Sequence, residues 1–126
     1  MKNEVIRIIS NMGFSIFQLK RNQYIVNDKY NVLLKYSIYD YNTDSTRFNL
    51  SVRLVNSPNI DFIIFIIQDS HFALVTPINI LRVIQPLMSR SQRNLAYTIH
   101  INPNNYFIRG TNTDLSPYLN NYRQLR

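Results

Sequence analysis

Lys35 is the residue whose type and setting most clearly suggest chemistry, because it lies within the otherwise apolar segment 31–40. Burying an ammonium group is costly, so a lysine in such a strand needs a functional or a structural reason. Leu33 stands two residues earlier and therefore shares a strand face with Lys35. The structural reason would be a stem that lies along the edge of the core while the ammonium reaches water. The functional reason depends on which acidic groups the chain can place nearby.

Side chains for metal or acid–base chemistry are scarce. Glu4 is the only glutamate beside six aspartates, so a carboxylate-based active site must be drawn from these seven residues. Cysteine is absent, which excludes disulfides, a thiol nucleophile and a Cys-type zinc site. The two histidines, His71 and His100, lie far apart and lack metal-ligand spacing. We therefore expect no preformed metal site, a turn position for His71 and a structural role for His100.

The charge balance favours a polyanionic partner. The formal net charge is +7 at pH 7, and most of the positive charge is arginine, which forks onto phosphate better than lysine does. We expect DNA or another nucleic acid as the partner, with phosphate contacts from Lys20, Arg21, Arg47, Arg53, Arg90 and Arg93. The alternative is that the excess charge only keeps a small protein soluble.

Length and composition indicate a single folded domain spanning residues 1–126. Hydrophobic residues make up 45% of the chain and charged residues 17%, which suits a globular core. The longest apolar run, 62–67, has the length of a strand, so no membrane partner is expected. Glu4 and Arg7 interrupt the first apolar residues, unlike a signal peptide, so we expect a cytoplasmic protein.

Hydrophobic periodicity predicts the elements of the first half of the chain. They are a helix over 3–12 that stops at Gly13, a strand over 14–19, and a hairpin of strands 23–26 and 32–39. A hairpin turn near Lys29 would place Lys35 opposite Tyr24. Clean alternation over 47–55 predicts a half-buried strand with a basic outer face, and 60–67 is apolar on both faces, which predicts a central strand.

The second half predicts a strand over 71–75 and then a helix in which Thr76 is the N-cap and Pro77 the first residue. Pro86 should limit or kink that helix. A basic loop over 88–94, strands over 97–101 and 106–109, and a short helix over 118–125 complete the chain. The fold class is therefore α+β, with a central, mostly antiparallel or mixed sheet flanked by helices.

The order helix–strands–helix–strand–helix resembles the core of the restriction-endonuclease-like, or PD-(D/E)XK, nucleases. The residues that carry the likeness are Met12-Gly13-Phe14, Leu33-Leu34-Lys35-Tyr36-Ser37, Asp61-Phe62-Ile63-Ile64-Phe65 and the C-terminal segment 118–122. In that family a carboxylate two residues before the strand lysine binds Mg²⁺, which polarises the phosphate and activates water. The resemblance thus implies a catalytic role for Lys35, with Leu33 in the place of the metal ligand.

The resemblance also suggests where other acids would lie. Asn22 occupies the neighbouring position where an upstream acid is expected, while Asp28 falls in the hairpin turn. Glu4 matches an acid that some family members carry on the first helix. For Asp61 the simpler interpretation is a residue at a strand start that bonds to a neighbouring turn.

Three hypotheses follow. The first is a nucleic-acid-binding protein of nuclease-like fold whose degenerate motif, Leu33-x-Lys35, leaves weak or no nuclease activity. The second is an active Mg²⁺-dependent DNA endonuclease with migrated acids, in which Glu4, Asp28 and Lys35 form the site. The third is a non-enzymatic protein-interaction or homo-oligomerisation module that uses a sheet edge or apolar face. Most tyrosines and phenylalanines should be core residues, with one or two able to stack on bases.

Overall fold

The computed structural model describes residues 2–68, 72–91, 96–102 and 105–126. The helices are α1 (Lys2–Asn11), α2 (Val52–Val55) and α3 (Ile78–Ile84), with 3₁₀ turns η1 (Gln85–Leu87), η2 (Ser116–Tyr118) and η3 (Tyr122–Leu125). The strands are β1 (Ile16–Lys20), β2 (Gln23–Val26), β3 (Tyr30–Ser37), β4 (Tyr39–Asp40), β5 (Ser45–Ser51), β6 (Phe62–Ile67), β7 (Ala73–Pro77), β8 (Ser89–Ser91) and β9 (Ala96–Ile101).

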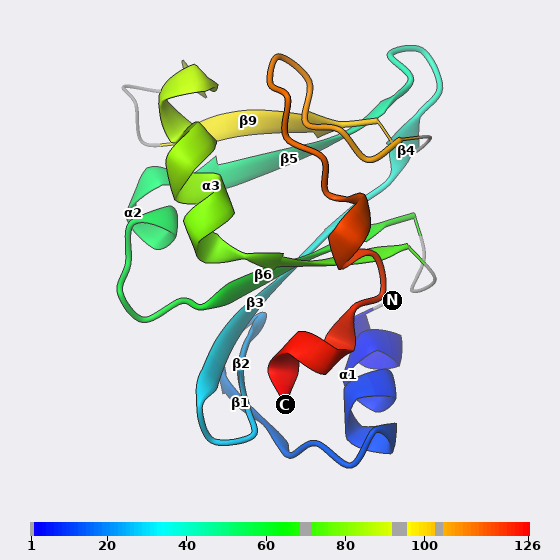
Figure 1. Cartoon of the computed structure of the whole chain (residues 1–126), viewed down its shortest axis with the longest axis vertical. Helices are drawn as coiled ribbons and strands as arrows, with labels where there is room; N and C mark the ends of the chain where they lie inside the picture. Colours follow the sequence, from blue (N-terminus) through cyan, green and yellow to red (C-terminus); the bar gives the residue numbers. More distant parts are fainter. Residues whose placement is uncertain (1, 69–71, 92–95, 103–104) are drawn as a thin grey trace.

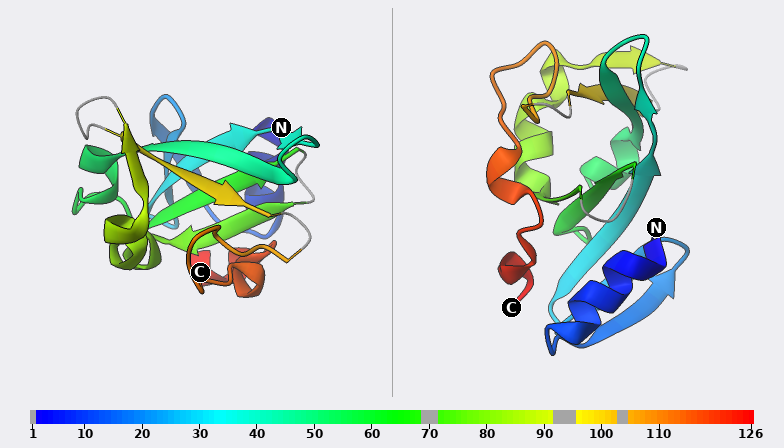
Figure 2. Two further views of the ribbon diagram at one scale, coloured as in Figure 1. Left: turned by 90° about the horizontal axis from the view of Figure 1, so that it is seen from above. Right: turned by 90° about the vertical axis from the view of Figure 1, so that its right-hand side faces the viewer.

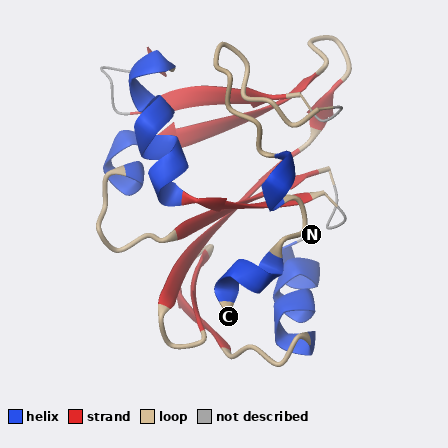
Figure 3. Cartoon of the chain, in the orientation of Figure 1, coloured by secondary structure: helices blue, strands red, loops and turns tan. Residues whose placement is uncertain are grey.

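These strands form two sheets (Figures 1 and 3). The five-stranded sheet has the order β1-β2-β3-β6-β7, in which β3 and β6 are parallel and the other pairs antiparallel. The four-stranded sheet, β4-β5-β9-β8, is antiparallel throughout. The α+β class and the mixed sheet are thus confirmed, whereas the sequence pattern did not predict a second sheet.

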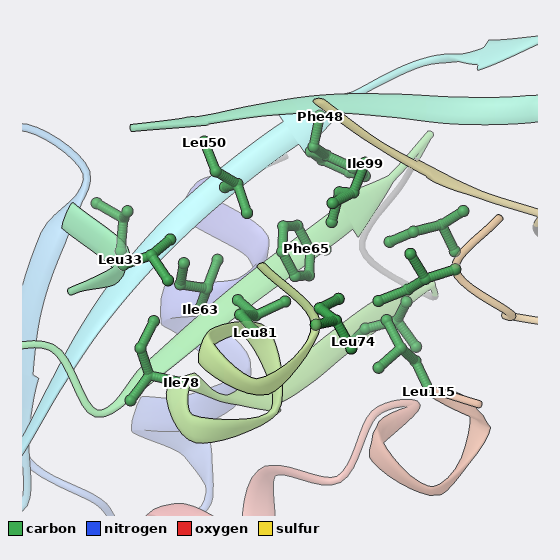
Figure 4. Packing of buried hydrophobic residues seen from close by; sticks show 14 of the residues in the cluster. Leu33, Phe48, Leu50, Ile63, Phe65, Leu74, Ile78, Leu81, Ile99 and Leu115 are labelled. Carbon is green, nitrogen blue, oxygen red and sulfur yellow. The ribbon is translucent and has the colours of Figure 1, made fainter. Parts of the chain in front are cut away.

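A hydrophobic core fills each face of the five-stranded sheet. Strand β6 explains the arrangement, because every one of its residues is buried and alternate side chains enter opposite cores. Its Phe65 packs against Phe48 of the four-stranded sheet, with ring centroids 4.8 Å apart, and Figure 4 shows Leu81 of α3 on the other side of Phe65. On the opposite face, α1 and η3 cover the sheet, and Figure 2 shows α1 and the four-stranded sheet at opposite ends of the molecule.

Helix α1 forms where its periodicity predicts it. Val5 and Ile9, one turn apart, are buried, and the chain leaves the helix at Gly13 with a φ of 84°. That left-handed conformation suits glycine, which has no Cβ to clash with the following backbone. The predicted helix over 3–12 is therefore confirmed to within one residue.

The β2–β3 hairpin has a tighter register than predicted. Asn27 and Asp28 adopt φ values of 53° and 56°, which asparagine and aspartate tolerate better than other side chains. The turn pairs Val26 with Tyr30, so Tyr24 lies opposite Val32 and not opposite Lys35. The predicted register was wrong by three residues because the pattern of apolar residues does not reveal a turn this short. Beyond the end of β2, Lys35 pairs only with β6.

Two other predicted elements change type. The alternating segment 47–55 is a strand only to Ser51, whose hydroxyl then accepts a hydrogen bond from the Leu54 backbone N–H at 3.4 Å and caps α2. The predicted C-terminal helix over 118–125 is instead the separate 3₁₀ turns η2 and η3. The prediction of an α-helix was wrong here, because so short a segment does not sustain one.

The boundaries of α3 also differ from the prediction. Pro77 is the N-cap, while Thr76 belongs to β7 and donates its hydroxyl to the Leu74 carbonyl at 3.1 Å. Pro86 lies in η1, where the α-helix ends as expected. The segment 106–109 makes isolated bridges rather than a strand, and the basic loop predicted over 88–94 begins as β8. Its residues 92–94, like His71, lie outside the described residues.

Candidate functional site

A groove of about 770 Å³ lies where the chain passes from the five-stranded sheet into the four-stranded sheet. Strand β3 continues into β4 at this point (Figure 1). One wall is the crossover segment, residues 35–43, and the other is formed by Arg47, Phe48 and Asn49 of β5 and His100 of β9. The groove thus joins segments that lie far apart in sequence, and the pairing of β5 with β9 determines its shape.

Lys35 lines the groove as a half-buried cation. Burial lowers the pKa of its ammonium because it removes water from the charged form, and the nearby ammonium of Lys2 lowers that pKa further. Within residues 2–68, 72–91, 96–102 and 105–126, the one ion pair joins Arg7 to Glu4. Lys35 therefore holds an unneutralised charge in a site where desolvation strengthens its attraction for an anion.

Arg47 and His100 are cross-strand partners on β5 and β9. Arg109 lies beside them: its backbone N–H donates to the His100 carbonyl at 2.8 Å, and its guanidinium donates to the Thr43 carbonyl at 2.8 Å. Burial lowers the pKa of the His100 imidazole, and the positive charges of Arg109 and Arg47 lower it further. The His100 Nδ1 is buried and makes no hydrogen bond to any part of the chain that the structure describes. These side chains form an electropositive corner suited to an anion.

Tyrosines dominate the crossover segment. The rings of Tyr39 and Tyr41 meet edge to face, with centroids 4.5 Å apart and an interplanar angle of 86°. The Tyr39 hydroxyl donates to the Asp44 carboxylate, which anchors the pair. Tyr41 is 83% exposed, and Tyr36, also in the groove wall, donates its hydroxyl to the Gln68 carbonyl at 3.3 Å. The groove therefore combines cations with accessible aromatic surface.

The structure does not bring the three predicted catalytic residues together. The Glu4 carboxylate bonds to Arg7 at 2.6 Å on α1, and Asp28 lies in the hairpin turn. Lys35 stands five residues beyond Tyr30 on β3, which at about 3.3 Å per residue separates it from that turn by about 16 Å. In the described ranges, no three residues among the histidines, aspartates and glutamates gather into a cluster suited to a metal ion.

The positions that correspond to the family's metal ligands are structural. Leu33 is 6% exposed and packs in the core between the sheets, where Figure 4 shows it near Ile63. Asn22 lies in the β1–β2 turn, with its side-chain carbonyl accepting from the Lys2 ammonium at 2.7 Å. Asp61 accepts from the Asn31 backbone N–H at 2.8 Å and so joins the starts of β3 and β6, as its simpler interpretation predicts.

Of the predicted phosphate-contacting residues, Arg47 lines the groove. Lys20 and Arg21 lie at the β1–β2 turn and Arg53 lies on α2, and none of these lines the groove. Arg90 belongs to β8 but its side chain is outside the description, as is the whole of Arg93. Sequence reasoning missed Arg109 and the place of His100 in the groove. The register of β5 with β9 places His100, a backbone bond to the His100 carbonyl places Arg109, and no local pattern encodes either contact.

Comparison of the chain with protein-family models, curated protein sequences and solved structures finds no match. A search of the described helices for one long and apolar enough to cross a membrane likewise finds none.

Proposed function

We propose that this protein binds nucleic acid through the groove beside the crossover segment. The observation that carries the proposal is the convergence of Lys35, Arg47 and His100 on one groove, with Arg109 beside it. Exposed tyrosines lie in the same wall, and the chain as a whole carries a net charge of +7. Cationic grooves with interleaved aromatic side chains suit a polymer of phosphates and bases.

Each part of the groove has a distinct role in this proposal. The guanidinium of Arg47 contacts a backbone phosphate, because its planar fork matches phosphate oxygens and no described carboxylate competes for it. The ammonium of Lys35 acts as a point charge at the more buried end of the site. Asn49, whose side-chain carbonyl accepts from the Thr98 hydroxyl at 2.8 Å, keeps its side-chain N–H donors for a ligand.

Binding without hydrolysis fits the groove better than catalysis does. Asp40 is the one carboxylate among the described residues that line the groove, and its Oδ1 already accepts the Asn42 backbone N–H at 2.9 Å. A Mg²⁺ site for phosphodiester cleavage needs several oxygen ligands.

A distant relation to restriction-endonuclease-like nucleases is part of the proposal. Helix α1, the β1–β3 meander and the parallel pairing of β3 with β6 support it, whereas the core position of Leu33 does not.

Fluorescence anisotropy with labelled single-stranded and duplex DNA tests the proposal. We expect binding that weakens between about 50 and about 200 mM salt. Arg47→Ala should lower the affinity and reduce the slope of log affinity against log salt by about 0.7 to 0.9. Arg123→Ala, which removes an exposed arginine that does not line the groove, is the control with the same charge change. Equal losses in the two variants, or no binding by the parent, would reject the groove as a nucleic-acid site.

A protein-interaction function has one observation in its favour. Strand β1 is an edge of the five-stranded sheet, and its Phe17 and Leu19 are 59% and 51% exposed. Edge strands with exposed apolar side chains can pair with another chain. Sedimentation of the parent and of Phe17→Lys tests this second candidate. A concentration-dependent dimer that the substitution abolishes would support it, and a monomer at all concentrations would exclude self-association.

A further inference from the structure

Tyr41 is the most exposed of the large hydrophobic residues described in the groove wall, and packing does not explain it. The residue is 83% exposed, whereas aromatic side chains in folded proteins usually bury most of their area. The ring is nevertheless held in place, because it meets Tyr39 edge to face and Tyr39 is anchored through its hydroxyl to Asp44. Ring area that is fixed and exposed is already ordered for stacking against a planar ligand.

The surroundings of Tyr41 extend this apolar surface along the crossover segment. Tyr36 is 41% exposed and Ile38 is 62% exposed, and both line the same groove. Across the groove lie Arg47 and His100, the cross-strand pair with no carboxylate partner in the described chain. An anion bound at the arginine would therefore place whatever is attached to it within the aromatic wall.

The size of the groove restricts which nucleic acid fits. Its volume of about 770 Å³ is that of a small-ligand site, for which about 300 to 1,000 Å³ is usual. Such a site admits one or two nucleotides, and a base must leave its stack before it can lie against an aromatic side chain. Bases in a duplex are already paired and stacked, so only a flexible strand presents them without an energetic penalty.

We propose that the groove selects single-stranded nucleic acid, with a base stacked on Tyr41 and its phosphate bound by Arg47 and Arg109 beside His100. This inference rests on the proposed nucleic-acid-binding function and adds the class of nucleic acid and the base-binding residue. Selectivity arises because the phosphate contacts alone do not distinguish one strand from two, whereas the tyrosine surface gains contacts only from an unpaired base.

The test uses three labelled probes that share a phosphate backbone: a short thymidine homopolymer, an abasic strand of equal length and the matching duplex. We expect the parent to bind the homopolymer most tightly. Tyr41→Ala should weaken homopolymer binding by at least about fivefold, the lower end of what one stacked base contributes, and leave abasic binding unchanged. Tyr41→Phe, which keeps the ring, should bind like the parent, and Arg47→Ala should weaken all probes.

The outcomes separate this inference from the function on which it rests. If the parent binds all three probes equally, or Tyr41→Ala loses no affinity for the homopolymer, stacking on Tyr41 is excluded while nucleic-acid binding stands. If the parent binds no probe, both fail. Because Tyr41 is exposed, its substitution should leave the fold intact, and a melting curve by circular dichroism that matches the parent's confirms that a loss of affinity is not a loss of structure.

Discussion

Arg47 of β5 lies directly opposite His100 of β9, so that a fixed positive charge is held next to an imidazole. Arg109 adds a second guanidinium from the far side, through its backbone bond to His100 and its side-chain bond to the Thr43 carbonyl. Two arginines beside a histidine disfavour the imidazolium form. An anion placed between them would reverse that effect, which makes His100 a reporter of anion binding.

The first prediction concerns the stability of the free protein as a function of pH. Burial, Arg109 and Arg47 lower the pKa of His100 in the folded state below its ordinary value of about 6.5. As the pH falls from about 7 to about 5, the unfolded chain therefore binds a proton that the folded chain resists, and the free energy of unfolding decreases. Urea denaturation across this range measures the decrease. His100→Gln should reduce the pH dependence, and an unchanged dependence in that variant would show that other groups cause it.

The second prediction concerns Leu33. Its side chain lies in the core between the sheets with 6% exposure, so Leu33→Glu places a carboxylate among buried apolar side chains. An uncompensated buried charge costs at least about 3 kcal/mol, which is a large part of the stability of a small domain. We expect a large fall in melting temperature in calorimetry that Mg²⁺ or Mn²⁺ does not reverse. Leu33→Met, which conserves volume, should cost less than about 1.5 kcal/mol.

If Mg²⁺ or Mn²⁺ restored the stability of Leu33→Glu, this expectation would be contradicted. Leu33 would then be better explained as the remnant of a metal site, in the place of the family's metal ligand. The structure favours the core interpretation because Asn22, the position expected to carry the second acid, bonds to Lys2. A lone carboxylate in the core would then have no second ligand with which to share a cation.

The third prediction concerns Tyr122 of η3, which is buried in the same core as Val5 and Ile9 of α1. Burial raises the pKa of Tyr122 to about 12, and its hydroxyl makes no hydrogen bond to the described residues. Below pH 10 the phenol is neutral in both states. Between pH 10 and 12 the unfolded chain loses the proton first, so stability decreases as the pH rises. Tyr122→Phe should make that decrease smaller and, by deleting an unpaired buried hydroxyl, raise the free energy of unfolding by about 1 kcal/mol.

Denaturant titrations at pH 8 and at about pH 11 measure the free energy of unfolding of the parent and of Tyr122→Phe. The two pH values lie on either side of the ordinary tyrosine pKa. A parent whose stability falls no more than that of Tyr122→Phe would show that the hydroxyl has a partner or contacts water. Tyr118→Phe, which removes the hydroxyl of a partly buried tyrosine that packs against the other core, is the matched control substitution.

How much of the fold and of the groove the sequence predicted depends on how far apart along the chain the interacting residues lie. Helix α1 and strand β6 were predictable because their own residues repeat with the period of their structure: Val5 and Ile9 one turn apart, and an unbroken apolar run from Phe62 to Ile67. The pattern of β5 also placed Arg47 on the outer face.

What the sequence could not reveal depends on pairings between distant segments. Nothing near His100 specifies that Arg47 will be its partner, because α2, β6, β7, α3 and β8 separate the two strands along the chain. The predicted register of the β2–β3 hairpin was wrong for a local reason. Two consecutive left-handed residues, Asn27 and Asp28, shorten the turn, and the hydrophobicity pattern does not reveal this. The groove depends on the pairing of β5 with β9, so the sequence alone did not predict it.

The last prediction concerns Lys35 and separates a functional role in the groove from a purely structural one. A functional lysine should affect DNA affinity and protein stability in opposite directions. Lys35→Met keeps an unbranched side chain of similar length and removes an ammonium whose charged form is disfavoured by burial and by Lys2. The free energy of unfolding should therefore stay constant or rise. If Lys35 serves the groove, affinity for single-stranded DNA should fall at the same time, by several-fold, because one phosphate contact is lost.

A variant that is more stable and binds more weakly is the signature of a residue kept for function, since a purely structural lysine has no reason to lower stability. Lys20→Met makes the same chemical change at an exposed site that does not line the groove, and it should leave both properties close to those of the parent. Thermal melting and anisotropy on the three proteins measure the two effects together. If Lys35→Met binds DNA as well as Lys20→Met does, Lys35 only extends its ammonium from the edge of the core to water.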